Sequence, residues 1–354
     1  MQEMQPRRDT FRLIRGAYDN PGEPVYADVP AVLPPLPEGQ EKNRLSFARW
    51  LVDPGNPLTA RVTVNRYWQM YFGTGLVKTT DNFGAQGEFP SHPELLDWLA
   101  TRFIDSNWDV KQMQRLIVTS ATYRQSSAVS SQLLERDPEN RLLARATRLR
   151  LPAQTIRDQA LAISGLLIER IGGPSVGPYQ PEGLWDDIVE RGQEYRLSEG
   201  EDLYRRGLYT FWKRTRPPPA MITFDSSTRE VHSLLFSRTN TPLQALNLMN
   251  DVTYAEASRA LAERTMSADS TVEQTVATMY RMATAREPDP AVRSVLVDAF
   301  SGHLVRYRSN RGAALQLVSA GQSARDQTLD IAELAAYQMV ASLILNLDAT
   351  ITKD

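Results

Sequence analysis

The chain of 354 residues is 42% hydrophobic and carries a net charge of −2, so it can bury a substantial core but lacks the positive charge typical of nucleic-acid-binding proteins. It has no cysteine, which excludes disulfides, iron–sulfur clusters, cysteine nucleophiles and covalent haem attachment within this chain. The three histidines, at positions 92, 232 and 303, are too far apart to share one helix face, so the sequence predicts no metal site.

No apolar run reaches the length needed to cross a bilayer, and the first residues lack the apolar stretch of a signal peptide. Residues 1–42 hold a proline-rich run with few backbone donors, so we expect an extended lead-in. Behind it the patterns predict a mainly α fold, a multi-helix domain with a small β-hairpin or sheet insertion. Its expected parts are an N-terminal helical half at 43–172, a loop-rich connector with the small β element at 173–236, and a C-terminal helical half at 237–354.

Two helices of the first half have clear signals at their ends. Helical spacing of aromatic and apolar residues predicts a helix from Thr59 to Phe72, which Gly73 ends because glycine accepts a positive φ. Ser91 followed by Glu94 predicts a capping box for a second helix. The residues of this helix that are expected to face the core are Leu95, Leu96, Leu99 and Phe103.

The loop between these two helices is the first candidate site. It places Asp81, Glu88 and His92 between rigid helices, where functional loops are common, and Asp81 and His92 are candidates for acid and base. Arg66 and Trp68 of the preceding helix, together with Glu88, are candidate ligand-binding residues. Under the structural alternative, the polar side chains stabilise turns and His92 lies in the first turn of a helix.

The middle of the chain combines one amphipathic helix with one strand signal. Pro152 is expected to start a helix that ends at the glycine pair after position 171, with core-facing residues Ile156, Ala160, Ile163, Leu167 and Ile171. Arg157 and Asp158 lie on its other faces, and we expect them to be solvated or paired structurally. The aromatic-rich run at 207–214 predicts a strand.

The proline-rich stretch after this strand is the second candidate site. It places Asp225, Arg229 and Glu230 close together in sequence, and Asp225 and Glu230 are candidates for acid–base work on a water or a sugar hydroxyl. Under the structural alternative, Asp225 caps a turn and Arg229 pairs with a buried carboxylate. The other candidate ligand-binding residues around this stretch are Trp212, Lys213 and Arg238.

The C-terminal half is predicted to be a series of helices. Thr241, Pro242 and Gln244 supply a cap, a first-turn proline and a capping box for a helix whose inward residues are expected to be Leu243, Leu246 and Met249. Further helices are expected at 253–266, 271–285, 290–308 and 331–347. The last is predicted to dock on the body through Leu334, Tyr337, Ala341, Ile344 and Leu345.

Long stretches of the chain resemble one family, among them RLSFARWLVDPGNPLTARVTVNRYWQMYFGTGLVKTTDNFGAQGEFPSHPELLDWLA, LIVTSATYRQSS, LYRRGLYTFWKRTRPPPAMITFDSSTRE and SRTNTPLQALNLMND. They resemble the planctomycete PSD-one domain, a bacterial domain of unknown function. The resemblance implies an extracytoplasmic, mostly helical domain carried behind modules that look like c-type cytochromes. It also implies that this chain is a piece of a longer precursor, that its partners are the upstream domains, and that any c-type haem belongs to them, with no cofactor in this chain.

The chain lacks G-x-S-x-G, P-loop, G-x-G-x-x-G and H-E-x-x-H motifs, so its function rests on three hypotheses. The first is a non-catalytic binding or assembly module that offers Trp68, Trp185 and Trp212 to glycans or to a neighbouring haem domain. The second is an acid–base hydrolase or lyase acting on polysaccharide, with the acids and the histidine of the two candidate loops as acid and base. The third is a helical scaffold whose tryptophans belong to the core.

Overall fold

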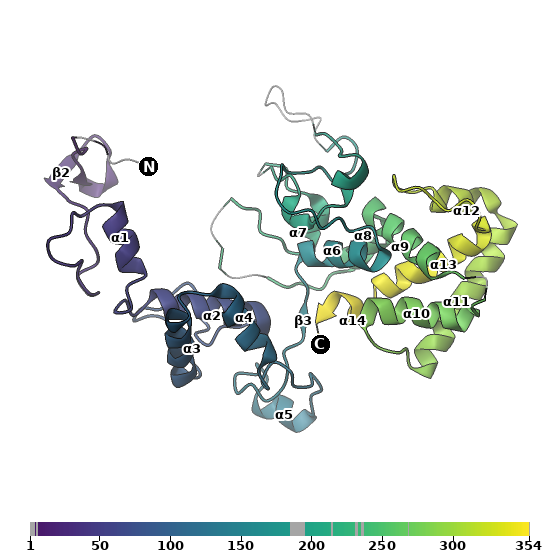
Figure 1. Cartoon of the computed structure of the whole chain (residues 1–354), viewed down its shortest axis with the longest axis horizontal. Helices are drawn as coiled ribbons and strands as arrows, with labels where there is room; N and C mark the ends of the chain where they lie inside the picture. The colour runs from purple at the N-terminus through teal and green to yellow at the C-terminus, as the bar shows by residue number, and fades with distance from the viewer. Residues whose placement is uncertain are drawn as a thin grey trace. The chain divides into compact units, whose positions relative to one another are not determined.

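The computed structural model describes residues 4, 6–184, 195–213, 215–230, 233–234, 237–267 and 269–353. The fold is mainly α, as predicted: these residues form fourteen α-helices, and their strands make two small antiparallel sheets. The chain divides into two compact units, residues 1–147 and 148–354 (Figure 1), whereas the sequence patterns place the end of the first helical half at residue 172. In the part of the chain that the structure describes, no helix has both the length and the apolar character that crossing a membrane requires.

Unit 1 consists of a small hairpin followed by helices. Its elements are β1 (Phe11–Leu13), the 3-10 helix η1 (Ile14–Gly16), β2 (Pro21–Pro24), α1 (Arg44–Leu51), α2 (Thr59–Phe72), α3 (Pro93–Asp105), α4 (Val110–Thr119) and α5 (Ser131–Arg136). Helices α2, α3 and α4 supply the core of this unit, in which Trp68 stacks on Phe72 with ring centroids 4.1 Å apart. The aromatic residues of α2 therefore pack inside unit 1.

The structure confirms the predicted end of α2 but not the predicted cap of α3. Gly73 ends α2 with a φ of 77°, as expected of a glycine at that position. The predicted capping box of α3 is wrong, because His92 is the N-cap residue and no side chain caps the helix. Ser91 is instead tied to the preceding loop, since its backbone N–H donates to Leu76 O at 2.9 Å.

The lead-in is more structured than its proline content predicts. Strand β1 pairs antiparallel with β2, so the first 24 residues include a hairpin. Farther along, the indole Nε1 of Trp50 on α1 donates to Pro34 O at 2.7 Å. The lead-in is therefore anchored on the first helix of unit 1, and one of the two small sheets lies here, where no β element was predicted.

Unit 2 is built around a helical bundle. Its elements are β3 (Leu149–Arg150), α6 (Ala153–Ser164), the 3-10 helices η2 (Gly200–Tyr204) and η3 (Gly207–Tyr209), α7 (Pro219–Thr223), α8 (Pro242–Asn250), α9 (Val252–Thr265), α10 (Val272–Thr284), α11 (Pro290–Ser309), α12 (Arg311–Val318), α13 (Ile331–Leu345), α14 (Asp348–Ile351) and β4 (Thr352–Lys353). Strands β3 and β4 pair antiparallel and bring the last residues beside the start of the unit.

Helix α13 is the central helix of unit 2. It packs against α9, α10, α11 and α12 (Figure 1), and eleven of its fifteen residues are buried. The predicted apolar stripe is buried as expected, but residues on the other faces, such as Ala335 and Gln338, are buried as well. A helix that is covered on every side is a core element and not a docked surface helix.

Helix α6 is shorter than the sequence pattern predicts. It ends at Ser164, and Gly165 adopts the left-handed conformation with a φ of 82°. The backbone N–H groups of the next two residues both donate to Leu161 O, at 2.8 and 3.1 Å, which closes the helix. Leu167 and Ile171 therefore lie outside it, and Ile171 is 90% exposed.

The strand predicted at 207–214 is wrong for its described residues. Gly207–Tyr209 is a 3-10 helix, and Thr210 makes only an isolated bridge with Val176. The backbone of this run bonds to two segments: Asp158 Oδ1 on α6 accepts the N–H of Gly207 at 2.6 Å, and the N–H of Phe211 donates to Val176 O at 2.7 Å. The predicted small β element therefore does not lie where the aromatic residues suggested.

Helix α8 forms with the predicted capping box, but its expected inward face points outward. Gln244 and Leu248 are the buried residues, and Gln244 Nε2 donates to Thr223 O at 3.0 Å and to Thr239 O at 3.1 Å. These bonds orient the helix with Gln244 inward. The three residues predicted to be buried are 58%, 56% and 45% exposed, namely Leu243, Leu246 and Met249.

Two leucines provide a matched test of these helix faces. Leu334 on α13 is 0% exposed, so Leu334→Ala leaves a cavity and is expected to lower the free energy of unfolding by about 2–5 kcal/mol. Leu243 on α8 is 58% exposed, so Leu243→Ala is expected to change it by less than about 0.5 kcal/mol. Urea denaturation of both variants measures the difference, and equal losses would contradict the outward orientation of α8.

Candidate functional site

Unit 2 contains a small cavity where α6, the loop at 178–181, α7, α8 and the start of α9 meet. Its volume is about 70 Å³, enough for several water molecules, since one water needs about 10–15 Å³. Prolines, alanines and a methionine form the apolar part of its wall. The polar side chains of the wall belong to Arg157, Tyr179, Gln180, Asn247, Asp251, Thr253 and Tyr254. Apolar walls with a few polar groups are typical of small-molecule sites.

Arg157 is the buried cation of this cavity. It lies on α6, is 5% exposed, and donates from Nη1 to Arg205 O at 2.6 Å and from Nη2 to Leu203 O at 2.8 Å. Burial lowers the pKa of its guanidinium, and the nearby Asp158 acts in the opposite direction. Its Nε has no hydrogen-bond partner among the described residues. Buried donors are normally satisfied, so this Nε is an exception, and the Nε atoms of Arg205 and Arg259 are in the same position.

The cavity wall also carries hydrogen-bond acceptors. Asp251 is the N-cap residue of α9 and accepts from the backbone N–H of Thr253 at 2.8 Å. Burial raises the pKa of its carboxyl, although the bonds from Thr253 and the charge of Arg157 act against this. Asn247, one turn earlier on α8, carries an Oδ1 that has no hydrogen-bond partner among the residues described. The cavity thus combines a cationic donor with anionic and neutral acceptors.

A second carboxyl with a raised pKa lies beside Arg157. Burial raises the pKa of Asp158, while the N–H of Gly207 and the charge of Arg157 act in the opposite direction. Carboxyl groups whose neutral form is favoured are suited to donating hydrogen bonds and to moving protons. The described residues contain no group of three or more His, Cys, Asp or Glu side chains arranged to hold a metal ion.

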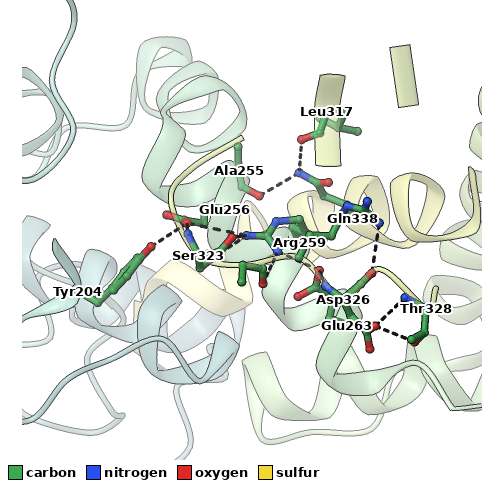
Figure 2. Close-up of polar contacts among 12 residues, drawn as sticks. Tyr204, Ala255, Glu256, Arg259, Glu263, Leu317, Ser323, Asp326, Thr328 and Gln338 are labelled. Atoms are coloured by element: carbon green, nitrogen blue, oxygen red, sulfur yellow. Dashed lines mark hydrogen bonds and ion pairs between the residues drawn. The ribbon is translucent and has the colours of Figure 1, made fainter. Parts of the chain in front are cut away.

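Tyr179 connects the cavity to a buried polar network. Its hydroxyl accepts from the backbone N–H of Gln322 at 2.7 Å, and burial together with the charge of Glu256 raises its pKa. Glu256 on α9 is 1% exposed, and its Oε1 accepts from Tyr204 at 2.8 Å and from the N–H of Ser323 at 2.6 Å (Figure 2). Burial, and then the bond to Glu256, raises the pKa of Tyr204 to about 12.

Arg259, the next charged residue of α9, fastens the loop at 319–330. It is 1% exposed and donates to Ser323 O at 2.8 Å and to Glu263 Oε1 at 2.9 Å (Figure 2). Glu263 Oε1 also accepts the N–H of Asp326 at 3.3 Å. The loop is therefore held by charged side chains of α9. Its Gln322 also bonds to Tyr179, which is a wall residue of the cavity.

The residues proposed as a site in unit 1 are separate from one another. Asp81, Glu88 and Arg66 are exposed, and no hydrogen bond or ion pair within the described chain joins them. His92 Nδ1 lies 3.0 Å from Ser91 Oγ. Trp68 is 4% exposed and belongs to the core of unit 1.

The residues proposed around position 225 make structural contacts. Asp225 forms an ion pair with Arg150, and its carboxylate accepts from the backbone N–H of Thr239 at 2.7 Å. The guanidinium of Arg229 lies over the ring of Trp212, 4.4 Å from its centroid. Lys213 is half-buried, whereas two further candidates are exposed, Glu230 and Arg238. Trp185 lies outside the described residues.

The cavity residues were not predicted as a site. Arg157 was expected to be solvated or structurally paired, and the bonds to backbone carbonyls show that it is a buried structural residue with one donor left over. Asn247 does offer a local signal, since it is a polar residue between Leu246 and Leu248 on a helix. That signal alone does not identify its partners, which lie far away in the sequence.

Comparison with known proteins adds one finding. The family model described as PSD1: Protein of unknown function (DUF1553) matches residues 43–300, which is most of the chain. No curated protein and no solved structure matches the chain. The matched range includes all the polar residues of the cavity wall.

Gly321 offers a test of the loop attachment. Its φ is +90°, and a Cβ there would lie 2.2 Å from Glu256 Cδ, so Gly321→Ala is expected to lower the free energy of unfolding by about 1–3 kcal/mol. The matched control is Gly302→Ala on α11, where no atom lies within 4 Å and alanine is expected to stabilise by about 0.5–1 kcal/mol. Chemical denaturation compares the two; the loop attachment is refuted if Gly321→Ala is as stable as the wild type.

The raised pKa of Asp251 predicts a pH-dependent stability. The folded protein holds this proton more tightly than the unfolded chain, whose carboxyl has the ordinary pKa of 3.8, so the contribution is complete below that pH and is lost as the pH rises through the raised value. Asp251→Ser keeps a capping hydroxyl and removes the titrating group. We expect the stability of the wild type relative to this variant to fall as the pH rises above about 4 in urea denaturation. A constant difference would show that the pKa is not raised.

Proposed function

Since the chain belongs to the PSD1 family of proteins of unknown function, we propose that it is a non-catalytic binding module whose cavity in unit 2 holds a hydroxyl-bearing ligand such as a sugar unit of a polysaccharide. One observation carries this proposal: Arg157 Nε and Asn247 Oδ1, a donor and an acceptor, both lack partners among the described residues and belong to side chains that line one cavity. A hydroxyl group donates and accepts, so it can satisfy both.

The charges of the cavity support a neutral ligand. A free anion would be attracted by Arg157 but repelled by the carboxylate of Asp251. A cation would be attracted by Asp251 but repelled by Arg157. A neutral hydroxyl avoids both repulsions. It gains hydrogen bonds to charged groups, which are worth about 1.5–3 kcal/mol each when buried.

The size of the cavity supports recognition of one end of a larger molecule. A volume of about 70 Å³ holds a few heavy atoms and not a whole sugar chain. Pro178, Pro218 and Met221 of the wall offer apolar contact to the carbon atoms that carry the hydroxyl groups. Such a site would select a terminal sugar or an exposed hydroxymethyl group.

The wider context belongs to the same proposal. The resemblance to the planctomycete domain supports an extracytoplasmic location and an assembly role beside upstream domains of the same precursor, with a c-type haem carried by those domains. The cavity supports the polysaccharide as ligand. Together they describe a module that brings a larger cytochrome-type protein to its carbohydrate partner.

A second candidate function is an acid–base hydrolase or lyase acting on polysaccharide. The observation in its favour is the raised pKa of Asp251 in the cavity wall, because a carboxyl that keeps its proton at higher pH can serve as a general acid. Asp158, whose pKa is also raised, is the nearest candidate for its counterpart.

Isothermal titration with a panel of neutral oligosaccharides tests the proposal. We expect one of them to bind the wild type and Asn247→Leu to weaken this binding about tenfold. Leucine is similar in shape to asparagine but has no acceptor, so the ligand hydroxyl is left unpaired. The matched control is Asn250→Leu on the same helix, where the residue is exposed and does not line the cavity.

Two kinds of result would contradict the proposed binding site. If no neutral oligosaccharide binds, or if Asn247→Leu and Asn250→Leu bind equally well while both remain folded, the cavity is not the binding site. Release of reducing ends from the bound oligosaccharide, abolished in Asp251→Ser, would replace the binding module with the hydrolase.

A further inference from the structure

Helix α8 exposes apolar side chains along most of its length. Leu243, Leu246 and Met249 are 58%, 56% and 45% exposed, and they follow one another at intervals of three residues. Residues three apart are neighbours on the surface of a helix, so the three side chains form one continuous ridge. Single exposed apolar residues are common on protein surfaces, whereas a contiguous apolar ridge marks an interaction surface.

The ridge takes no part in holding α8 on the body of unit 2. The buried residues of the helix are Gln244 and Leu248, and Gln244 Nε2 donates to the carbonyls of Thr223 and Thr239. These contacts fix the inner side of the helix. The ridge lies on the exposed side, where it can contact another molecule.

The exposed side of α8 carries no charge. The nine residues of the helix include no acidic or basic residue, and Pro242, Ala245 and Asn250 complete its exposed surface. Depletion of charged residues is typical of the centre of a protein interface. A surface without charges lacks the groups that select a different partner by electrostatic complementarity, and it meets no like-charge repulsion when it contacts a second copy of itself.

The spacing of the ridge is symmetric about Leu246. Leu243 lies three residues before it, and Met249 lies three residues after it. In a contact with two-fold symmetry two copies of α8 run antiparallel, so Leu246 meets Leu246 of the second copy and Leu243 meets Met249 on both sides. Leucine and methionine have similar volumes, which makes the ridge complementary to itself. The antiparallel arrangement also places the two helix dipoles in opposite directions.

We propose that α8 is a self-association surface, through which two copies of the chain form a symmetric dimer on the ridge of Leu243, Leu246 and Met249. The nine residues of the helix span about 14 Å. A contact of this length is smaller than a standard interface, which buries about 800 Å² on each partner, so the dimer is weak and reversible. It stabilises the fold only above its dissociation constant, and denaturation of Leu243→Ala below that concentration therefore reports on the single copy.

Sedimentation equilibrium of the full chain over a series of concentrations tests this proposal. We expect the average mass of the wild type to rise from that of one chain towards that of two. Leu246→Glu and Leu246→Lys each bring like charges together at the two-fold axis, so each variant alone is expected to dimerise at least about tenfold more weakly. An equimolar mixture of the two variants brings opposite charges together, and it is expected to dimerise at least about tenfold more tightly than either variant alone.

Val305→Glu on α11 is the matched control. Val305 is 72% exposed and belongs to a different helix, so this variant is expected to dimerise like the wild type. Recovery of the dimer in the mixture requires both Leu246 variants to be folded, so it excludes misfolding as the cause of their losses. A wild type that stays monomeric at every concentration overturns the proposal. An equal loss in Val305→Glu, or a mixture that dimerises no more tightly than the separate variants, also overturns it.

Discussion

The structure of unit 2 depends on two charged residues that α9 buries, Glu256 and Arg259. Removing an ion from water costs several kcal/mol, so each must find partners inside the protein. They form an ion pair in which Arg259 Nη2 lies 3.9 Å from Glu256 Oε1, too far for a hydrogen bond, so each forms its hydrogen bonds with other groups. Glu256 takes Tyr204 and the backbone of Ser323, and Arg259 takes the carbonyl of Ser323, so the same requirement fastens two distant segments to one helix.

Buried arginines replace regular secondary structure in the loop-rich part of unit 2. Arg157 binds the carbonyls of residues 203 and 205, and Arg205, which is 0% exposed, donates to Pro174 O at 3.1 Å and stacks on Tyr209 at 3.8 Å. Backbone carbonyls that would otherwise pair in strands are thus satisfied by guanidinium groups. A guanidinium has five donors, and the carbonyls do not use all of those of Arg157, whose Nε has no partner among the described residues and whose side chain lines the cavity.

Local signals located many of the helices but not the cap of α3, the end of α6 or the orientation of α8. Gly73 and the capping box of Thr241 and Gln244 were read from neighbouring residues, and both are confirmed. The face of α8 was predicted wrongly because apolar residues occur on two of its sides, and the choice is made by bonds from Gln244 to residues outside the helix. The cavity escaped prediction for the same reason, since Arg157 and Asn247 belong to helices ninety positions apart in sequence and only the fold brings them to one cavity.

The family match and the packing of unit 2 have different limits. The match at 43–300 includes the cavity but stops before α13, although α9 and α11 both pack on that helix. The matched range therefore leaves out a helix against which α9, the helix capped by Asp251 of the cavity wall, packs. Walls fixed by a bundle core keep donors and acceptors at set distances, which suits selection of one hydroxyl pattern.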